Sequence, residues 1–477
     1  MRRSSIAWLP VAAALLVLAR AHNAQAQESA PPPDSTAAPT GSGIGIAYWG
    51  VIPPASDSVS VTFRGRPMPV WEGMLVWPYR VITFPLRLLS DGIGESVEFL
   101  DEKRVIYSVA KLLGPRRGPF GAVLELSAGG LPGLGGGVAL EHDAFFGPRN
   151  RFRLRGAASI RGHRRLGLGM QFAAGDRGEL VVGAGFRERN NARYFGLGPF
   201  TQAEDSSFYR QKLAWGGASY RHNLGSSLFL TGDVLFSAIG TGLPRDDDDP
   251  PITLRFAGAL LPDGFGRYSH GVSFGLSLSH ETATETGRPR KGGIRRLRAA
   301  YYRGLGDDDA GFWTYRAELQ QFVRLWYRNN VLALRAHLTW LDPVGTTSIP
   351  FQRLMTNDDP DLMRGFRDFR WRDQGMVVFS AEYRWPVWVY QRPEGPGLDL
   401  YLLTDIGQVF NDFDQISVDN LAFSYGIGLR LLTARGLVLR LEYARSGEDA
   451  VWRLRTDQIF QFARGGLFHG RDPVPIR

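Results

Sequence analysis

One serine lies in a pattern that could support nucleophilic catalysis. Residues Gly271 to Gly275 read Gly-Val-Ser-Phe-Gly, which matches the hydrolase signature in which a serine occupies a sharp turn between a strand and a helix. Here Ser273 falls within a segment of alternating side chains rather than at such a turn. Small residues on one face of a strand explain the match better, so we predict no serine hydrolase.

The residue types that bind metals or nucleotides are also poorly arranged for that chemistry. The eight histidines are scattered, and the absence of cysteine from 477 residues excludes disulfides, thiolate catalysis and cysteine metal sites. Asp246–Asp249 and Asp307–Asp309 could offer oxygens to calcium, but solvated loop tips are the simpler interpretation. Gly133–Gly137 lacks the Lys-Ser/Thr of a phosphate-binding loop. We expect no catalytic residue, no metal site and no cofactor, and we predict that the protein is not an enzyme.

The elements that carry these residues are strands. Between Gly397 and Phe410, apolar side chains alternate with a second set that includes Asp399 and Asp405. Successive side chains of a strand point to opposite faces, so each such segment has one apolar and one mixed face. In a soluble sandwich the apolar face meets another sheet, whereas in a transmembrane barrel it meets lipid. The local pattern alone cannot decide between the two.

The N-terminus favours the barrel. Arg2 and Arg3 precede an apolar run from residue 6 to 18, and Ala24-Gln25-Ala26 fits the cleavage pattern of a secretory signal. We predict a signal peptide over residues 1–26 and a mature chain that begins near Gln27. The mean hydropathy of −0.17 and the 22% of charged residues do not argue against a membrane barrel, since only half of each strand must be apolar.

The chain divides into five predicted regions. Residues 1–26 form the signal peptide, residues 27–43 a disordered linker rich in Pro, Ser and Thr, and residues 44–117 a short periplasmic or interfacial region. Residues 118–462 form the transmembrane β-barrel, and residues 463–477 a C-terminal tail. The barrel pattern contains about sixteen strands, an even number as expected for a bacterial barrel. The predicted strands lie near 120–128, 136–146, 150–162, 165–174, 178–188, 208–222, 226–237, 269–281, 292–304, 312–326, 330–340, 376–387, 397–410, 422–432, 435–445 and 453–462.

Charge and loop length are consistent with this architecture. The long predicted loops, 240–266 and 342–374, suit the external side, and the short turns suit the periplasmic side. The net charge of +9 indicates basic loops and a basic lumen, because no basic stretch forms a recognisable nucleic-acid-binding module. We therefore expect outer-membrane lipid, and no nucleic acid, as a partner.

A motif in the second long loop resembles a known family. The residues that carry the resemblance are Pro350-Phe351, Leu362-Met363-Arg364-Gly365-Phe366-Arg367-Asp368, Phe369-Arg370-Trp371-Arg372-Asp373, Glu382-Tyr383-Arg384, Tyr194-Phe195-Gly196-Leu197-Gly198, Leu332–Ala336 and Asp405-Ile406-Gly407. Together they resemble the bacterial surface antigen family of BamA/TamA-type outer-membrane β-barrels, over residues 118 to 462. Several motifs in the expected order are more specific than a lone Arg-Gly-Phe, which would ordinarily be a surface turn.

The resemblance implies a specific internal site. In that family the Arg-Gly-Phe tip folds back into the lumen, which implies that Arg364, Gly365 and Phe366 meet Asp405, Gly407 and Glu382 on the inner wall. A guanidinium can form paired hydrogen bonds with such carboxylates, which would be costly to bury alone. Phe460 and Phe462 fit the aromatic ending expected of an outer-membrane sorting signal, although a tail follows them.

The resemblance also implies a function, although the region before the barrel departs from the family pattern. Family assembly factors carry periplasmic POTRA domains, and residues 44–117 lack their clear pattern, so recruitment of clients is in doubt. We expect a barrel in the Gram-negative outer membrane that inserts, assembles or translocates proteins, or lipids, with unfolded outer-membrane proteins as clients. A glycine-rich stretch after the first strand could weaken a seam with the last strand. The alternatives are a passive, anion-preferring porin-like channel and a surface anchor.

Overall fold

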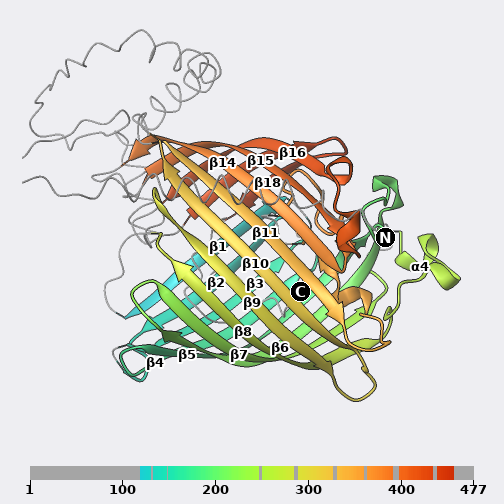
Figure 1. Ribbon diagram of the computed structural model, residues 1–477, viewed down its shortest axis with the longest axis horizontal. Helices are drawn as coiled ribbons and strands as arrows, with labels where there is room; N and C mark the ends of the chain where they lie inside the picture. Colours follow the sequence, from blue (N-terminus) through green and yellow to red (C-terminus); the bar gives the residue numbers. More distant parts are fainter. Residues whose placement is uncertain are drawn as a thin grey trace, which may run out of the picture.

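The computed structural model describes most of the predicted barrel region (Figure 1). The described residues are 119–455 without 130, 132, 148, 246–249, 284–287, 326–329, 359–361, 390–396 and 433–437. The predicted signal peptide, linker, periplasmic region and tail lie outside them, as do Phe460 and Phe462.

Sixteen antiparallel strands close into one barrel, as the sequence predicted. Each strand pairs with its neighbours in sequence, and closure comes from pairing of the first strand with the last. The strands of the first half are β1 (Phe120–Gly129), β2 (Gly135–Asp143), β3 (Arg151–Ser159), β4 (Arg164–Ala174), β5 (Gly178–Tyr194), β6 (Ser207–Asn223), β7 (Leu228–Gly242) and β8 (Tyr268–Glu281). Those of the second half are β9 (Gly292–Gly304), β10 (Gly311–Arg324), β11 (Val331–Pro343), β14 (Gly375–Val389), β15 (Gly397–Phe410), β16 (Ala422–Leu432), β17 (Val438–Ser446) and β18 (Ala450–Arg455).

The two faces of the barrel are the reverse of those of a soluble protein. On the outside, Leu276 and Leu297 expose 56% and 63% of their surface. On the inside, Arg298 donates to Asp233 from the opposite face of the same region. Apolar groups outside and paired charges inside are the arrangement of a membrane-spanning barrel.

The strand limits depart from prediction where polar residues interrupt the alternation. β5 continues to Tyr194 rather than ending near 188, and its register shifts between Arg189 and Ala192. The polar run Arg-Asn-Asn broke the apolar pattern, yet β5 is paired with β6 on both sides of this bulge. The last strand begins at Ala450, three residues earlier than predicted, and is described as far as Arg455.

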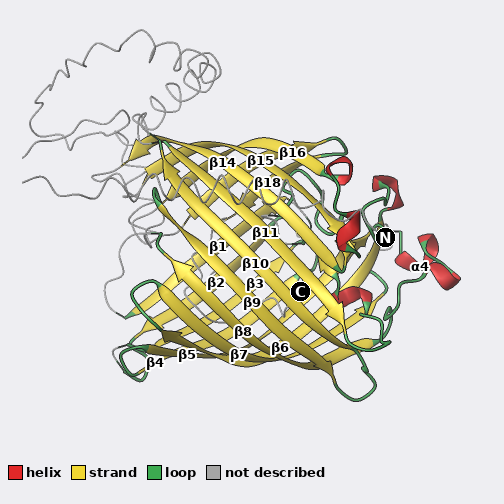
Figure 2. Cartoon of the chain, in the orientation of Figure 1, coloured by secondary structure: helices red, strands yellow, loops and turns green. Residues whose placement is uncertain are grey.

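The long connections gather at one end of the barrel. They include 3-10 helices η1 (Ala203–Asp205), η2 (Gly258–Leu260), η3 (Phe351–Arg353), η4 (Phe413–Gln415) and η5 (Val418–Asn420), and the short helix α4 (Ile252–Arg255). All the helical turns lie together at this end, on the right of Figure 2. We call it the long-loop end. Among the described residues, no helix is long and apolar enough to cross a membrane.

Residues 344–374, between β11 and β14, form what we call the internal loop. Within it, β12 (Met355–Thr356) pairs briefly with β13 (Arg372–Asp373). Side chains of this loop, including Phe351, Met363 and Phe369, form one buried apolar cluster with inward residues of the wall such as Tyr209 and Tyr302. The loop therefore packs inside the barrel at its long-loop end.

Candidate functional site: the internal loop and the inner wall

The tip of the internal loop is a tight turn. Phe366 donates its amide to the carbonyl of Met363 at 3.0 Å, and Met363 adopts a φ of +57°. Gly365 is absent from the residues with positive φ, so the backbone conformation of the turn does not itself require glycine there. A Cβ at Gly365 would instead lie 2.5 Å from Cβ of Ser424 and 2.8 Å from the backbone of Arg445. Gly365 is needed because the tip touches the wall.

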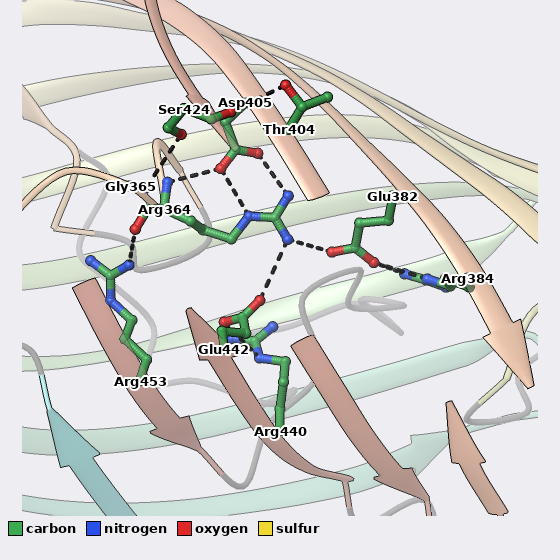
Figure 3. Close-up of polar contacts among 10 residues, drawn as sticks. All are labelled: Arg364, Gly365, Glu382, Arg384, Thr404, Asp405, Ser424, Arg440, Glu442 and Arg453. Carbon is green, nitrogen blue, oxygen red and sulfur yellow. Dashed lines mark hydrogen bonds and ion pairs between the residues drawn. The ribbon is translucent and has the colours of Figure 1, made fainter. Parts of the chain in front are cut away.

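Arg364 is bound by carboxylates from several strands (Figure 3). Its Nε and Nη2 donate to the two oxygens of Asp405, each at 2.8 Å, and its amide donates to the same carboxylate at 2.8 Å. Nη1 donates to Glu382. The side chains of Arg364 and Asp405 are completely buried. This is the paired, charge-assisted geometry that recognises a carboxylate most strongly.

The surrounding charges balance. Glu382 also accepts from Arg384 on its own strand at 2.9 Å. A third carboxylate, Glu442 of β17, lies 3.5 Å from Arg364 and 3.2 Å from Arg440. Three guanidinium groups thus face three carboxylates, which offsets the cost of burying them. The sequence motif did not identify Glu442, although its inward position follows from the alternation of Leu439, Leu441 and Tyr443.

Arg453 of β18 holds the backbone of the same tip. Its guanidinium donates to the carbonyl oxygens of Arg364 and Phe366, the latter at 2.9 Å (Figure 3 shows the first contact). It also donates to Asp368 at 3.0 Å. Burial alone would raise the pKa of Asp368, but Arg453 and Arg455 hold it below its usual value. Asp368 is therefore a buried anion at neutral pH.

Small and aromatic residues also contribute to the packing around the tip of the internal loop. A Cβ at Gly407 would approach the sulfur of Met363 to 2.9 Å and the carbonyl of Val377 to 2.5 Å, so glycine admits the tip at this position. Phe366 is buried, and its ring meets that of Trp371 edge-on at 5.6 Å. The structure thus brings together the predicted residues Arg364, Gly365 and Phe366 with the wall residues Glu382, Asp405 and Gly407.

The base of the internal loop is anchored to the opposite wall. Arg353 is buried, and it donates to the hydroxyls of Ser237 on β7 and Ser269 on β8, each at 2.8 Å. Its guanidinium also stacks over the ring of Tyr302 at 4.2 Å. Sequence reasoning missed Arg353, because a single arginine followed by unrelated loop residues carries no periodic signal. The loop is thus a bridge between β7–β9 and β14–β18.

The other candidates from the sequence have structural roles. Ser273 lies within β8, and its hydroxyl donates to a backbone carbonyl at 3.4 Å. Asp308, expected at a solvated loop tip, is instead buried and accepts from Ser269 at 2.7 Å and Tyr302 at 2.9 Å. That finding corrects the prediction for Asp308, whereas Asp307 and Asp309 are exposed as expected. Over the described part of the chain, no group of three or more His, Asp or Glu could hold a metal. Asp246–Asp249 lie outside it.

One loop carboxyl should make the internal loop sensitive to pH. Burial raises the pKa of Asp373 from 3.8 to about 6, and only the amide of Gln374 opposes the shift. Between these two values the folded state keeps a proton that the unfolded chain releases, so the folded loop loses stability as the pH rises. We expect the thermal unfolding midpoint to fall between pH 4 and 7, and to fall less in Asp373→Asn. Equal slopes in both proteins would contradict this assignment.

Comparison with known proteins gives a family domain and a fold. Residues 264–468 match the Omp85 superfamily domain. BamA from Haemophilus ducreyi lacking POTRA domains 1–3 superposes with a TM-score of 0.52 at 13% identity, over 72% of this chain and 70% of that one. CdiB from Acinetobacter baumannii gives a TM-score of 0.47 at 13% identity, over 70% of this chain and 59% of that one. No curated protein matches this sequence.

Proposed function

We propose that this chain, a Gram-negative outer-membrane barrel of the BamA/TamA type with an Omp85 superfamily domain, inserts or translocates polypeptides at the seam between β1 and β18. Its clients would be unfolded outer-membrane proteins. The observation that carries the proposal is the buried pairing of Arg364 with Asp405 and Glu382, which fixes the internal loop beside the last strands.

The seam is the junction at which the first and last strands close the barrel. β1 pairs with β18 at three positions, from Ser127–Arg455 to Gly129–Arg453, whereas it pairs with β2 at eight. The described part of β18 ends at Arg455, so this comparison concerns residues up to that point. Where β1 and β18 separate, their backbone donors and acceptors could pair with an incoming strand. A client strand could therefore add to β1 or β18.

A passive anion channel is the second candidate. The many inward arginines, such as Arg296 and Arg335, favour passage of anions. Two facts weigh against it. These arginines pair with Glu281 and Glu318, and the internal loop fills the long-loop end with packed apolar side chains. A passive channel would not need an internal loop that is bound both to β7–β9 and to β14–β18.

A reporter experiment separates the two functions. A small unfolded barrel is refolded into liposomes with and without the purified protein, and ion conductance is recorded on the same preparation. Assembly predicts faster reporter folding that is lost in Arg364→Ala. Unchanged reporter folding with steady anion conductance would contradict the proposal and support a channel.

A further inference from the structure

We infer that Asp368 is a clasp that holds the β1–β18 seam closed from inside the barrel. The inference deepens the proposed function, on which it rests, by naming the residue that restrains the seam. Asp368 is a positioning residue, because it would act by accepting hydrogen bonds from a donor on each side of the seam.

The carboxylate of Asp368 joins the two sides of the seam. Its Oδ2 accepts from the amide of Leu131, just after β1, at 3.1 Å. Its Oδ1 accepts from Nη2 of Arg453 on β18 at 3.0 Å. Asp368 is 5% exposed, so both hydrogen bonds are shielded from water. One buried side chain thus spans a junction that otherwise has three described register pairs.

On the β18 side, several further contacts tie the strand to the internal loop. Arg453 also donates to the backbone of Arg364 and Phe366. In the turn before β18, Glu448 accepts two hydrogen bonds from Arg370, at 2.6 and 2.7 Å, and Asp449 accepts from Arg367. Loss of Asp368 would therefore leave β18 fixed to the loop.

On the β1 side, the attachment depends far more on Asp368. Among the described residues, the amide of Leu131 donates to the loop through Asp368, and the Leu131 side chain is buried in the apolar cluster. The Leu131 carbonyl accepts from Arg161, which belongs to the turn between β3 and β4 rather than to the loop. When the clasp is lost, β1 and its hairpin partners should move away while β18 stays in place.

Distances between spin labels can test this asymmetry. The chain has no cysteine, so introduced cysteines are unique labelling sites. Leu134 reports on the turn after β1, Gly447 on the turn before β18, and Val418 in η5 serves as the reference; Leu134 and Val418 are 60% and 70% exposed, and a Cβ at Gly447 meets no atom within 4 Å. The pairs Leu134–Val418 and Gly447–Val418 are measured by pulsed electron resonance in nanodiscs.

In Asp368→Ala we expect a second Leu134–Val418 population, displaced by about one strand spacing, ~5 Å, while the Gly447–Val418 distance stays the same. Asp368→Asn keeps one acceptor oxygen and should show a smaller second population. If the alanine variant fails to fold, the same distances are measured in Asp368→Asn alone. The matched control is Asp358→Asn, which removes a loop carboxylate that pairs with Arg189 on β5, away from the seam, at 2.9 Å.

The outcomes separate the clasp from the proposed function. Unchanged Leu134–Val418 distances in both Asp368 variants would overturn the clasp, whatever the reporter assay gives. Equal displacement in Asp358→Asn would overturn it too, because a general loosening of the loop would then suffice. A displaced Leu134 population without any effect on reporter folding would leave the clasp standing and count against the assembly function.

Discussion

Arg364→Ala is expected to lower the free energy of unfolding by about 3–5 kcal/mol, because it leaves buried carboxylates without their partner. The loss involves Asp405, which accepts three hydrogen bonds from Arg364, and Glu382, which accepts one. The hydrogen bond from the backbone amide of residue 364 to Asp405 can still form in this variant. It cannot replace the positive charge of the lost guanidinium. Urea unfolding of the refolded barrel measures the change. We also expect reporter folding to fall to the rate without the protein.

Arg367→Ala is the matched control for this prediction. Arg367 lies three residues away in the same loop and pairs with Asp449, but its side chain is 49% exposed. Exposed ion pairs contribute roughly 0–1 kcal/mol, so the control should remain close to the wild type. Similar unfolding midpoints for Arg364→Ala and the wild-type protein would contradict a stabilising role for the pairing of Arg364 with Asp405 and Glu382.

Gly365→Val should prevent the tip from seating. A Cβ at this position meets Cβ of Ser424 at 2.5 Å and the backbone of Arg445 at 2.8 Å, and the paired backbone of Arg445 cannot move aside cheaply. The two methyl groups of valine enlarge the clash. We expect loss of the Arg364 contacts and a destabilisation of a few kcal/mol, comparable to that of overpacked cores, ~1–3 kcal/mol or more. Protease cleavage within residues 362–371 should increase in parallel.

The control is a glycine with space around it. Gly225 lies in the turn between β6 and β7, and a Cβ there meets no atom within 4 Å. Gly225→Val should therefore change neither unfolding nor protease sensitivity appreciably. If Gly365→Val behaves like Gly225→Val, the tip does not press against the wall as described.

The strands of the barrel were predictable because the pattern that specifies each strand lies within that strand's own residues. Alternation in Gly397–Phe410 reproduces the limits of β15, and the same rule located all sixteen strands. A lipid-facing strand must present apolar groups at every second position, so each strand carries its own signal. The signal fails where strands leave the apolar zone, as in Arg189–Tyr194 of β5, because backbone pairing continues there without any apolar requirement.

The interior was harder to predict, because its contacts join distant segments. The motif located Arg364 and the wall residues Asp405 and Glu382, but Glu442 was not among them. Arg353 binds serines more than 80 residues away, and Asp368 joins the amide of Leu131 to Arg453. Almost every residue type has a backbone amide, so the residue type at a position does not reveal that its amide donates a hydrogen bond. Such contacts are visible only once the strands have been placed around the barrel.

The central claim, that clients are handled at the seam, is tested most directly by locking it. Ala128 and Leu454 are register partners across β1 and β18, and the chain has no other cysteine to interfere with a pair introduced there. The rate of reporter folding is measured for Ala128→Cys/Leu454→Cys before and after oxidation, and again after reduction. We predict that oxidation removes the acceleration and that reduction restores it. Equal acceleration by the oxidised and reduced forms would contradict assembly at the seam.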